Sequence, residues 1–428
     1  MEQNIKTKYY KSSDIIPVAV LLLTIFFWAV RFHFFLNFDI PLYIIIVSLL
    51  VIISVIYFND IILFELYILV FLVIFIIQLK LFGIHFSNIP RTLIYIPAFS
   101  FLIVFLYRNF KSLTPRAVEY FFIASSYLIY AQFITQILQL FLFLMGIRSI
   151  PNFTYINYFF NYPRASGFFY EPADLAYSLS PFIFLFIYDY KTYIKRFKKY
   201  TAVCLIFIFI LSPSATFFVI LILALLIRLY KFIRSNLSVT RLIKFFILIL
   251  LFLSVTIYIF YKNTGLHNRA FQVIDYAASP NLVSTKTNLS VLGFIKGLQM
   301  SEKALTKYPL GVGILNMQYL NKFSSVSKLG KFYKRLNEHD GTSLAFKMVS
   351  ELGYFGLLII IISFIVLLKN IGNRMSDKRL LETSFIFGLI SSYIRCDSYI
   401  YGVPIIGLSL IFHNLISLKL KNKIFLIK

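Results

Sequence analysis

Residues 201–230 read TAVCLIFIFILSPSATFFVILILALLIRLY, a long apolar run that is broken once, by Ser212-Pro213-Ser214. One interpretation is a single kinked helix, since proline can bend a helix without ending it. The other is a pair of short helices, 201–212 and 215–230. The choice decides on which side every later segment of the chain lies, and the charge pattern described below favours the pair.

The composition around this run is that of a membrane protein. The 428 residues are 60% hydrophobic and 14% charged, whereas soluble domains average about 45–50% apolar and about 25% charged. So few polar side chains could not coat a soluble globule, and disordered, collagenous and disulfide-scaffold chains are excluded as well. At about 20 residues per span, the apolar residues supply roughly twelve helices. We expect an all-α polytopic membrane protein with a single membrane domain over residues 1–428.

Twelve spanning helices can be placed on the longest apolar runs. They are expected at 15–31, 41–58, 61–79, 92–107, 117–145, 173–188, 201–212, 215–230, 243–261, 342–368, 380–398 and 403–418. A further, amphipathic helix is expected at 289–306, before the turn-rich stretch YPLGVG at 308–313.

The distribution of the net charge of +25 predicts the topology. A basic total can indicate nucleic-acid binding, but in membrane proteins Lys and Arg gather in cytoplasmic loops. With the N-terminus inside, the cytoplasmic segments hold 24 Lys and Arg, and the short segments on the other side hold five. Both termini are therefore expected in the cytoplasm, and nucleic acid is not an expected partner. The basic segments are 1–14, 108–116, 189–200, 228–244, 369–379 and 419–428.

Two segments on the outer side are too long to be simple turns. Residues 146–172 form one loop, and residues 262–341 form a larger one with 11 Lys or Arg and four acids. A connection of such length is uncommon unless it has a function. The sequence has no P-loop, no dinucleotide-type glycine fingerprint and no His/Cys cluster at metal-ligand spacing, so we expect neither a cofactor nor a metal.

The smaller loop ends in YPRASGFFYEPAD at 162–174. Arg164 lies on the outer side, where positive charge is rare, close to Gly167, which permits the close approach of a ligand. It could equally snorkel to lipid headgroups. Pro172 suits the first turn of a helix, so Glu171 and Asp174 can be helix caps or catalytic groups.

The larger loop ends in EHDGT at 338–342 and leads into a helix. His339 stands between carboxylates that can orient or charge its ring, although an ordinary loop histidine is the alternative. Asp340 and Glu351 are 11 residues apart, close to three turns, so they share a helix face. Lys347 precedes Glu351 by four residues and can neutralise it.

Other polar groups fall inside the expected helices. Gln132, Gln136 and Gln139 follow the i, i+4, i+7 spacing of one helix face, turned to the bundle or to a cavity. Arg395 lies near an outer helix end, with Asp397 or Glu351 as candidate partners. Arg395 can belong to a functional site or can simply join two helices, and the sequence leaves both alternatives open.

Three stretches in order carry a resemblance to a known family: RASGFFYEPADLA at 164–176, PLGVG at 309–313 and HDGTSLAFKMVSELGYFG at 339–356. Together they resemble the O-antigen polymerase and O-antigen ligase superfamily, the Wzy-type and WaaL-type membrane glycosyltransferases. The resemblance covers residues 146–360 and the twelve-span layout. It implies a GT-C-like fold in a Gram-negative inner membrane, with outer loops in the periplasm, no metal, and a donor glycan on undecaprenyl pyrophosphate.

The resemblance also implies functional residues: a periplasmic arginine pair and a histidine near the end of the long loop. Arg164 and His339 stand at two of these positions, and Glu351 joins them as a catalytic candidate. For the second arginine position the sequence offers Arg269, Lys286 and Lys296. The further substrate-binding candidates are Arg395, Asp340 and Glu171.

The chemistry fits these residue types. A pyrophosphate leaving group needs cations, and arginine can hold two phosphate oxygens in a fixed fork. The attacking sugar hydroxyl needs a base, and histidine titrates near neutral pH. We expect a polymerase that joins undecaprenyl-pyrophosphate-linked repeat units. Its partners are the lipid-linked donor and acceptor glycans, membrane lipids and a polysaccharide chain-length regulator.

Two alternatives remain open. An O-antigen ligase would use the same chemistry with lipid A–core as acceptor. A lipid-linked sugar flippase or other transporter would also be basic and polytopic. Transporters tend to have matched repeats and broken helices at mid-membrane, so a single 80-residue outer loop argues against that class.

Overall fold

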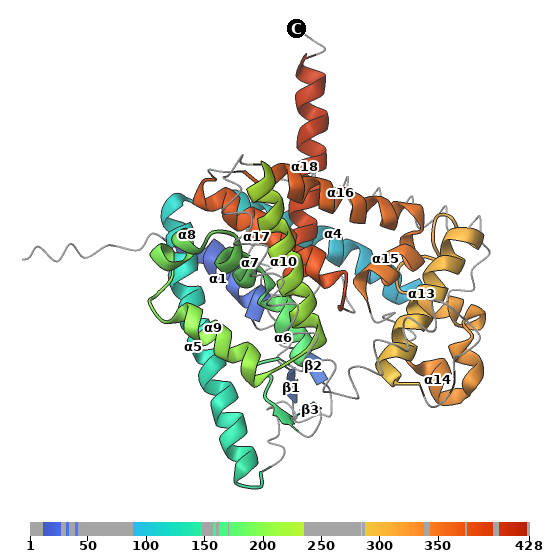
Figure 1. Ribbon diagram of the computed structural model, residues 1–428. Coiled ribbons are helices and arrows are strands. Elements are labelled where there is room, and N and C mark those ends of the chain that lie inside the picture. The colour runs from blue at the N-terminus through green and yellow to red at the C-terminus, as the bar shows by residue number, and fades with distance from the viewer. Residues whose placement is uncertain are drawn as a thin grey trace, which may run out of the picture.

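The computed structural model describes residues 12–26, 31–33, 39–41, 89–147, 157–159, 162–169, 171–234, 284, 287–337, 343–372, 375–396 and 402–425. Most of these residues are helical. The helices form a main body, and α13 and α14 form a smaller lobe at its side (Figure 1).

A buried helix, α17 (Asp377–Ser392), forms the centre of the body. Every residue from Thr383 to Ser392 is buried. The helix packs against α7 (Ser180–Tyr188), α16 (Tyr354–Asn370) and α18 (Gly402–Phe425). Its buried serines donate to carbonyl oxygens of the same helix, so they need no partner outside it.

Three helices from the first third of the chain pack around this centre: α1 (Ser12–Phe26), α4 (Ile89–Lys111) and α5 (Pro115–Leu144). Thr114 caps α5, since its Oγ1 accepts a hydrogen bond from the N–H of Ala117 at 3.0 Å, and proline follows it at the first helical position. The 30 residues of α5 rise about 45 Å. This length exceeds the roughly 30 Å of a bilayer's apolar core.

The broken run at 201–230 forms two helices, as predicted: α9 (Thr201–Leu211) and α10 (Ala215–Arg234). The rings of Phe209 and Phe217 stack across the break, with centroids 3.9 Å apart. A short helix that was not predicted, α8 (Tyr190–Arg196), precedes the pair.

Two other runs, each predicted as a single helix, are divided. The 173–188 run forms α6 (Pro172–Ser178) and α7, because Pro181 cannot continue the hydrogen bonding of the preceding turn. The 342–368 run forms α15 (Leu344–Leu352) and α16, with Gly353 between them at φ +60°.

The remaining predicted helices correspond to helices of the structure where they can be compared, and the largest difference at a helix end is at α18 (Gly402–Phe425), which continues seven residues beyond the predicted end at 418. The runs at 92–107, 117–145, 289–306 and 403–418 correspond to α4, α5, α13 (Leu289–Lys307) and α18. The 15–31 run corresponds to α1, and the 380–398 run ends early, with α17. The predicted helices at 41–58, 61–79 and 243–261 lie outside the described residues.

The described residues are mostly helical, which agrees with the predicted all-α class, and they also include two short hairpins. Strand β1 (Arg31–His33) pairs antiparallel with β2 (Asp39–Pro41), so that Arg31 lies opposite Pro41. Strand β3 (Asn157–Phe159) pairs antiparallel with β4 (Tyr162–Arg164), so that Asn157 lies opposite Arg164. These hairpins were not predicted, and the second one ends at the candidate Arg164.

The lobe consists of α13, two 3-10 helices, η2 (Met317–Phe323) and η3 (Val326–Leu329), and α14 (Lys331–Arg335). Its two small apolar clusters are separate from the main core; they are Met300, Ala304, Val312, Met317 and Leu320, and Val291, Leu292, Ile295 and Val326. Helix α13 packs against α15, where the ring of Phe294 meets that of Phe346 edge-on at 5.0 Å. The lobe is therefore attached to the body through α15.

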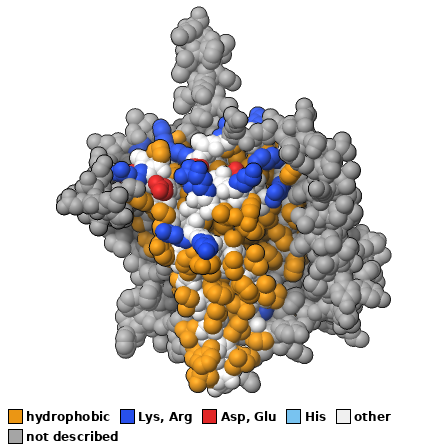
Figure 2. All heavy atoms as spheres, turned by 60° about the vertical axis from the view of Figure 1, so that its left-hand side comes forward, with side chains coloured by type: hydrophobic (Ala, Val, Ile, Leu, Met, Phe, Trp, Pro, Cys, Tyr) orange, Lys and Arg blue, Asp and Glu red, His pale blue; other side chains and the backbone are white. Residues whose placement is uncertain are grey.

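Among the described residues, two helices are long and apolar enough to cross a bilayer: Pro115–Leu144 and Ala215–Ile233. Shorter apolar helices are Asp14–Phe26, Thr201–Leu211, Tyr354–Asn370 and Gly402–Phe412. Large apolar side chains are exposed along α5, α9 and α10. Figure 2 shows this apolar face with basic side chains gathered at one end.

Candidate functional site

Three glutamines of α5 hold the loop between β4 and α6. Gln132, Gln136 and Gln139 are buried and bind the loop's backbone instead of solvent. The side-chain amides donate from Gln132 Nε2 to Ser166 O at 3.0 Å, from Gln136 Nε2 to Ala165 O at 2.8 Å and from Gln139 Nε2 to Gly167 O at 3.1 Å. In return, Gln132 Oε1 accepts from Phe168 N at 3.0 Å, and Gln139 Oε1 accepts from Gly167 N at 2.9 Å. Of the two alternatives that the sequence left open, the bundle or a cavity, the structure shows the glutamines facing the bundle; the loop as their partner was not predicted.

Gly167 is required at the centre of this loop. It has φ +63°, and a Cβ at this position would overlap the side-chain amide of Gln132. The sequence suggested that this glycine permits a ligand to approach. In the structure the approaching group is an amide of the protein itself.

Arg164 lies against the break between α9 and α10. Its Nη1 donates a hydrogen bond to the carbonyl oxygen of Pro213 at 3.2 Å. The next residue, Ala165, donates its N–H to the carbonyl oxygen of Leu211, the last residue of α9, at 3.3 Å. Helix ends leave carbonyl groups without partners inside the helix, and a cation is favourable there. The break between α9 and α10, which decides on which side the later segments are expected, therefore also positions the candidate arginine.

The position of the loop along α5 gives its level in the body. Gln132 follows Pro115, the first residue of α5, by 17 residues, which is about 26 Å along a helix axis. The basic segment 108–116 lies at the start of this helix. The Arg164 loop is thus well separated along α5 from the charges that we expect to be cytoplasmic.

Glu171 forms an ion pair with Arg395. Arg395 Nη2 lies 3.6 Å from Oε2 of Glu171, and the two side chains are 35% and 44% exposed. Glu171 is also the N-cap residue of α6, and its N–H donates to Oδ2 of Asp174 at 3.3 Å. The partner of Arg395 is therefore Glu171 rather than Glu351, while Asp397, the other candidate, lies outside the described residues.

The PLGVG turn is joined to the α15–α16 junction through the backbone. Val312 N donates to Ser350 O at 3.0 Å, Gly313 N to Glu351 O at 3.0 Å, and Tyr354 N to Pro309 O at 2.9 Å. The contact is so close that a Cβ at Gly353 would overlap the carbonyl oxygen of Pro309. Two of the three stretches that carry the family resemblance thus form one packed unit.

The end of α17 connects this unit to the first stretch. Ser343, the N-cap of α15, donates its hydroxyl hydrogen to the carbonyl oxygen of Tyr393. The hydroxyl of Tyr393 lies 2.8 Å from Oγ of Ser363 on α16. Two residues further along, Arg395 pairs with Glu171. Residues 393–395 therefore contact both the first and the third of the resembling stretches.

Glu351 and Lys347 lie on the buried side of α15, with 0% and 6% of their surfaces exposed. They are four residues apart on this helix, as the sequence indicated. The catalytic assignment of Glu351 stays a prediction, and its carboxylate belongs to the interior of the body.

Lys296 is fully buried in the lobe and is bound to main-chain oxygens. Its Nζ donates to the carbonyl oxygens of Lys334 at 2.7 Å, Leu336 at 2.7 Å and Tyr333 at 3.3 Å. Lysine near a helix C-terminus satisfies the last carbonyl groups in this way. In this position Lys296 holds the end of α14.

Helix α14 lines a cavity of about 860 Å³. The described residues at its wall are Lys331, Phe332, Lys334, Arg335 and Leu336. They include three cations and no acid, and the cavity falls within the usual size range of small-molecule sites. These residues were not predicted among the 11 basic ones of the loop, and the buried Lys296 beneath them has no signal in the sequence.

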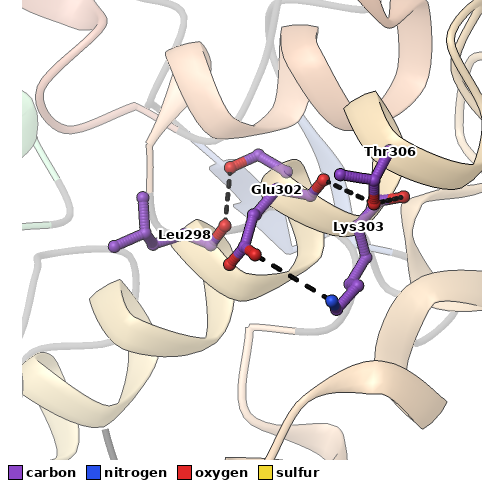
Figure 3. A network of polar contacts seen from close by, with 5 residues as sticks. Leu298, Glu302, Lys303 and Thr306 are labelled. Atoms are coloured by element: carbon purple, nitrogen blue, oxygen red, sulfur yellow. Dashed lines mark hydrogen bonds and ion pairs between the residues drawn. The ribbon is translucent and has the colours of Figure 1, made fainter. Parts of the chain in front are cut away.

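The outward side of α13 has local contacts. Lys303 Nζ lies 3.9 Å from Glu302 Oε1, and the Thr306 hydroxyl donates to the carbonyl oxygen of Glu302 at 3.1 Å. Figure 3 shows both contacts. Beyond the helix end, burial raises the pKa of Tyr308, and a hydrogen bond with Lys322 lowers the pKa of Tyr319.

Four of the predicted site residues, His339, Asp340, Arg269 and Lys286, lie outside the described residues, and their roles stay predictions. Within the described part of the chain, no group of three or more His, Cys, Asp and Glu side chains could hold a metal ion. Comparison with protein-family models, curated proteins and solved structures gives no match. The candidate site therefore rests on its residues and geometry.

Proposed function

We propose that this chain is a polytopic membrane glycosyltransferase of the O-antigen polymerase type. It would cross a Gram-negative inner membrane with about twelve helices, with both termini in the cytoplasm. It would join undecaprenyl-pyrophosphate-linked oligosaccharide repeat units at the periplasmic face. The exposed apolar faces of α5, α9 and α10 support the membrane part of this proposal, because soluble monomers rarely expose apolar patches of this extent.

One observation carries the catalytic part. Three stretches far apart in the sequence are connected: residues 309–313 bond to the third stretch, 343–356, and residues 393–395 contact both that stretch and the first one, 164–174. The same three stretches, in the same order, carry the resemblance to the polymerase and ligase superfamily. Segments that meet in this way can share one substrate, which separate loops could not do.

In the proposed reaction, the hydroxyl oxygen of the acceptor sugar attacks the anomeric carbon of the donor glycan. The bond between that carbon and the pyrophosphate oxygen breaks, and its electron pair leaves with undecaprenyl pyrophosphate. The hydroxyl proton passes to His339, which acts as general base. The growing chain is thereby transferred to the incoming lipid-linked repeat unit with inversion at the anomeric carbon.

Cations placed at the departing pyrophosphate would supply most of the rate enhancement, because charge stabilisation is usually the largest catalytic term. Arg164 is held on the α9–α10 break for this task. In the lobe, Lys334 and Arg335 line the cavity, and Leu336, three residues before His339 in the sequence, belongs to the same wall. Lys296 would act on them as a positioning residue through the α14 carbonyl groups.

The test is in vitro polymerisation of a purified lipid-linked repeat unit. Arg164→Lys keeps the charge but loses the bidentate fork, so it should be almost as inactive as Arg164→Ala. Arg196→Lys makes the same change at a partly exposed pair with Asp377 and should keep normal activity. His339→Ala should lose about 100-fold or more in rate. Full activity of Arg164→Lys would reject the arginine clamp.

The acceptor is tested separately, in a strain that lacks the gene. A lipopolysaccharide gel with a single-repeat band supports a polymerase. Bare core oligosaccharide would contradict the polymerase and point to the ligase, whose acceptor is lipid A–core, or to a flippase.

A further inference from the structure

Helices α5 and α9 lie side by side and run in the same direction. The contacts follow in order along both helices: Lys198 N donates to Ser126 Oγ at 3.1 Å, Thr201 Oγ1 to Tyr130 OH at 3.2 Å, and Gln136 Nε2 to Ile208 O at 3.3 Å. The pair therefore has one end at the turn that joins α8 to α9, and the Arg164 loop lies further along it.

The outer side of this pair is apolar. Side chains about half exposed or more project from both helices; they are Ile134, Ile137, Leu138 and Phe141 on α5, and Val203, Ile206, Phe207 and Ile210 on α9. The described part of the chain leaves this side open, since Ile134 and Ile210 are each 62% exposed. Figure 2 shows this surface as a continuous apolar face below a band of cations.

The end of the face has a different composition. Lys198 and Lys199 are exposed there next to two exposed tyrosines, with Lys198 Nζ 6.0 Å from the ring centre of Tyr127 and Lys199 Nζ 5.4 Å from that of Tyr200. The nearby acid of the same segment, Asp189, is engaged in capping α8 through Thr192. Tyrosine and lysine at the end of an apolar face are typical of the level of lipid headgroups.

We propose that the Lys198–Lys199 turn binds the headgroup of an anionic phospholipid whose acyl chains cover the exposed face of α5 and α9. The two ammonium groups would hold the headgroup phosphate, and the Tyr127 and Tyr200 rings would lie at the interface. Anionic lipids attract basic segments on the cytoplasmic surface. The inference rests on the membrane placement in the proposed function and is independent of the glycosyl transfer.

The experiment is native mass spectrometry of the full chain, released from nanodiscs of phosphatidylglycerol and phosphatidylcholine. The wild type should retain phosphatidylglycerol in preference to phosphatidylcholine. The double variant Lys198→Gln/Lys199→Gln should bind phosphatidylglycerol roughly 10- to 30-fold more weakly, since each lysine near the surface contributes to the attraction. The control Lys307→Gln/Lys328→Gln removes the same charge from the lobe and should bind like the wild type.

Equal retention of phosphatidylglycerol by the wild type and the Lys198/Lys199 variant would overturn the proposal. An equal loss in the lobe control would also overturn it, because net charge and not this turn would then attract the lipid. A chain that does not enter nanodiscs would contradict the membrane placement itself. Failure of the polymerisation assay alone would leave this inference untouched.

Discussion

The backbone of the Arg164 loop and the backbone at the end of α14 in the lobe are held by two different kinds of hydrogen-bond partner. In the loop, neutral glutamine amides pair with backbone amides inside an apolar body. In the lobe, the ammonium group of Lys296 pairs with the carbonyl oxygens at the end of α14. A buried charge has a much larger desolvation cost than a buried amide. The body holds its loop with neutral amides, whereas the lobe holds the exposed helix α14 with a buried cation whose ammonium group is compensated by three carbonyl oxygens.

This difference suggests different tasks. Buried backbone that is not helical requires hydrogen-bond partners, and the glutamines that supply them leave the loop little freedom around Arg164. The cations of α14 are exposed at a cavity, and Lys296 holds carbonyl groups of the backbone beneath them. We expect substitutions in the loop to affect folding and substitutions at α14 to affect binding.

The largest effect is expected for Gly167→Ala. The new Cβ would displace the Gln132 amide, and left-handed strain of about 1–2 kcal/mol would add to lost hydrogen bonds of about 1–3 kcal/mol each. The body should lose about 3 kcal/mol or more, measured as thermal unfolding in detergent. Gly146→Ala is the control, because Gly146 also has positive φ, +85°, but has nothing within 4 Å of the place that a methyl group would occupy. Equal melting of both variants would show that the glutamines do not hold the loop.

An intermediate effect is expected for Lys296→Met. The carbonyl groups at the end of α14 would lose their ammonium partner, at about 2–4 kcal/mol. Hydrogen exchange should rise in α14 and η3 while the body keeps its protection. Lys303 lies on the outward side of the same helix (Figure 3), so Lys303→Met should change neither the hydrogen exchange of α14 and η3 nor the protection of the body. Faster exchange throughout the body would mean that the lobe and the body unfold as one unit, which would contradict their description as two separately held regions.

The smallest effect on stability is expected for Glu171→Gln. The pair with Arg395 is about one third or more exposed on both sides, and exposed pairs contribute about 0–1 kcal/mol. Unfolding should therefore shift by less than about 1 kcal/mol, while donor binding falls if residues 393–395 belong to the site. A shift like that of Gly167→Ala would place this pair among the structural contacts instead.

The helices were largely predictable, because runs such as 117–145 and 289–306 carry a clear apolar pattern. The division at Leu179 was missed although Pro181 marks it in the sequence, and the division at Gly353 was missed because it depends on a contact with the distant Pro309. The glutamine face was predicted from its spacing, but its partner loop was not, because a single helix face does not identify its neighbour. The burial of Lys296 was not predicted either, since its neighbours in the sequence carry no sign of the α14 carbonyl groups that receive it.

The shortness of α9 has a consequence for how the protein is made. Its 11 residues rise about 16 Å, roughly half of a bilayer's apolar core, so this segment is too short to enter a membrane as an independent span. Only Ser212, Pro213 and Ser214 separate it from α10. During synthesis the two helices should therefore insert together as a hairpin, and the carbonyl group that receives Arg164 would be in place before the later half of the chain has been translated.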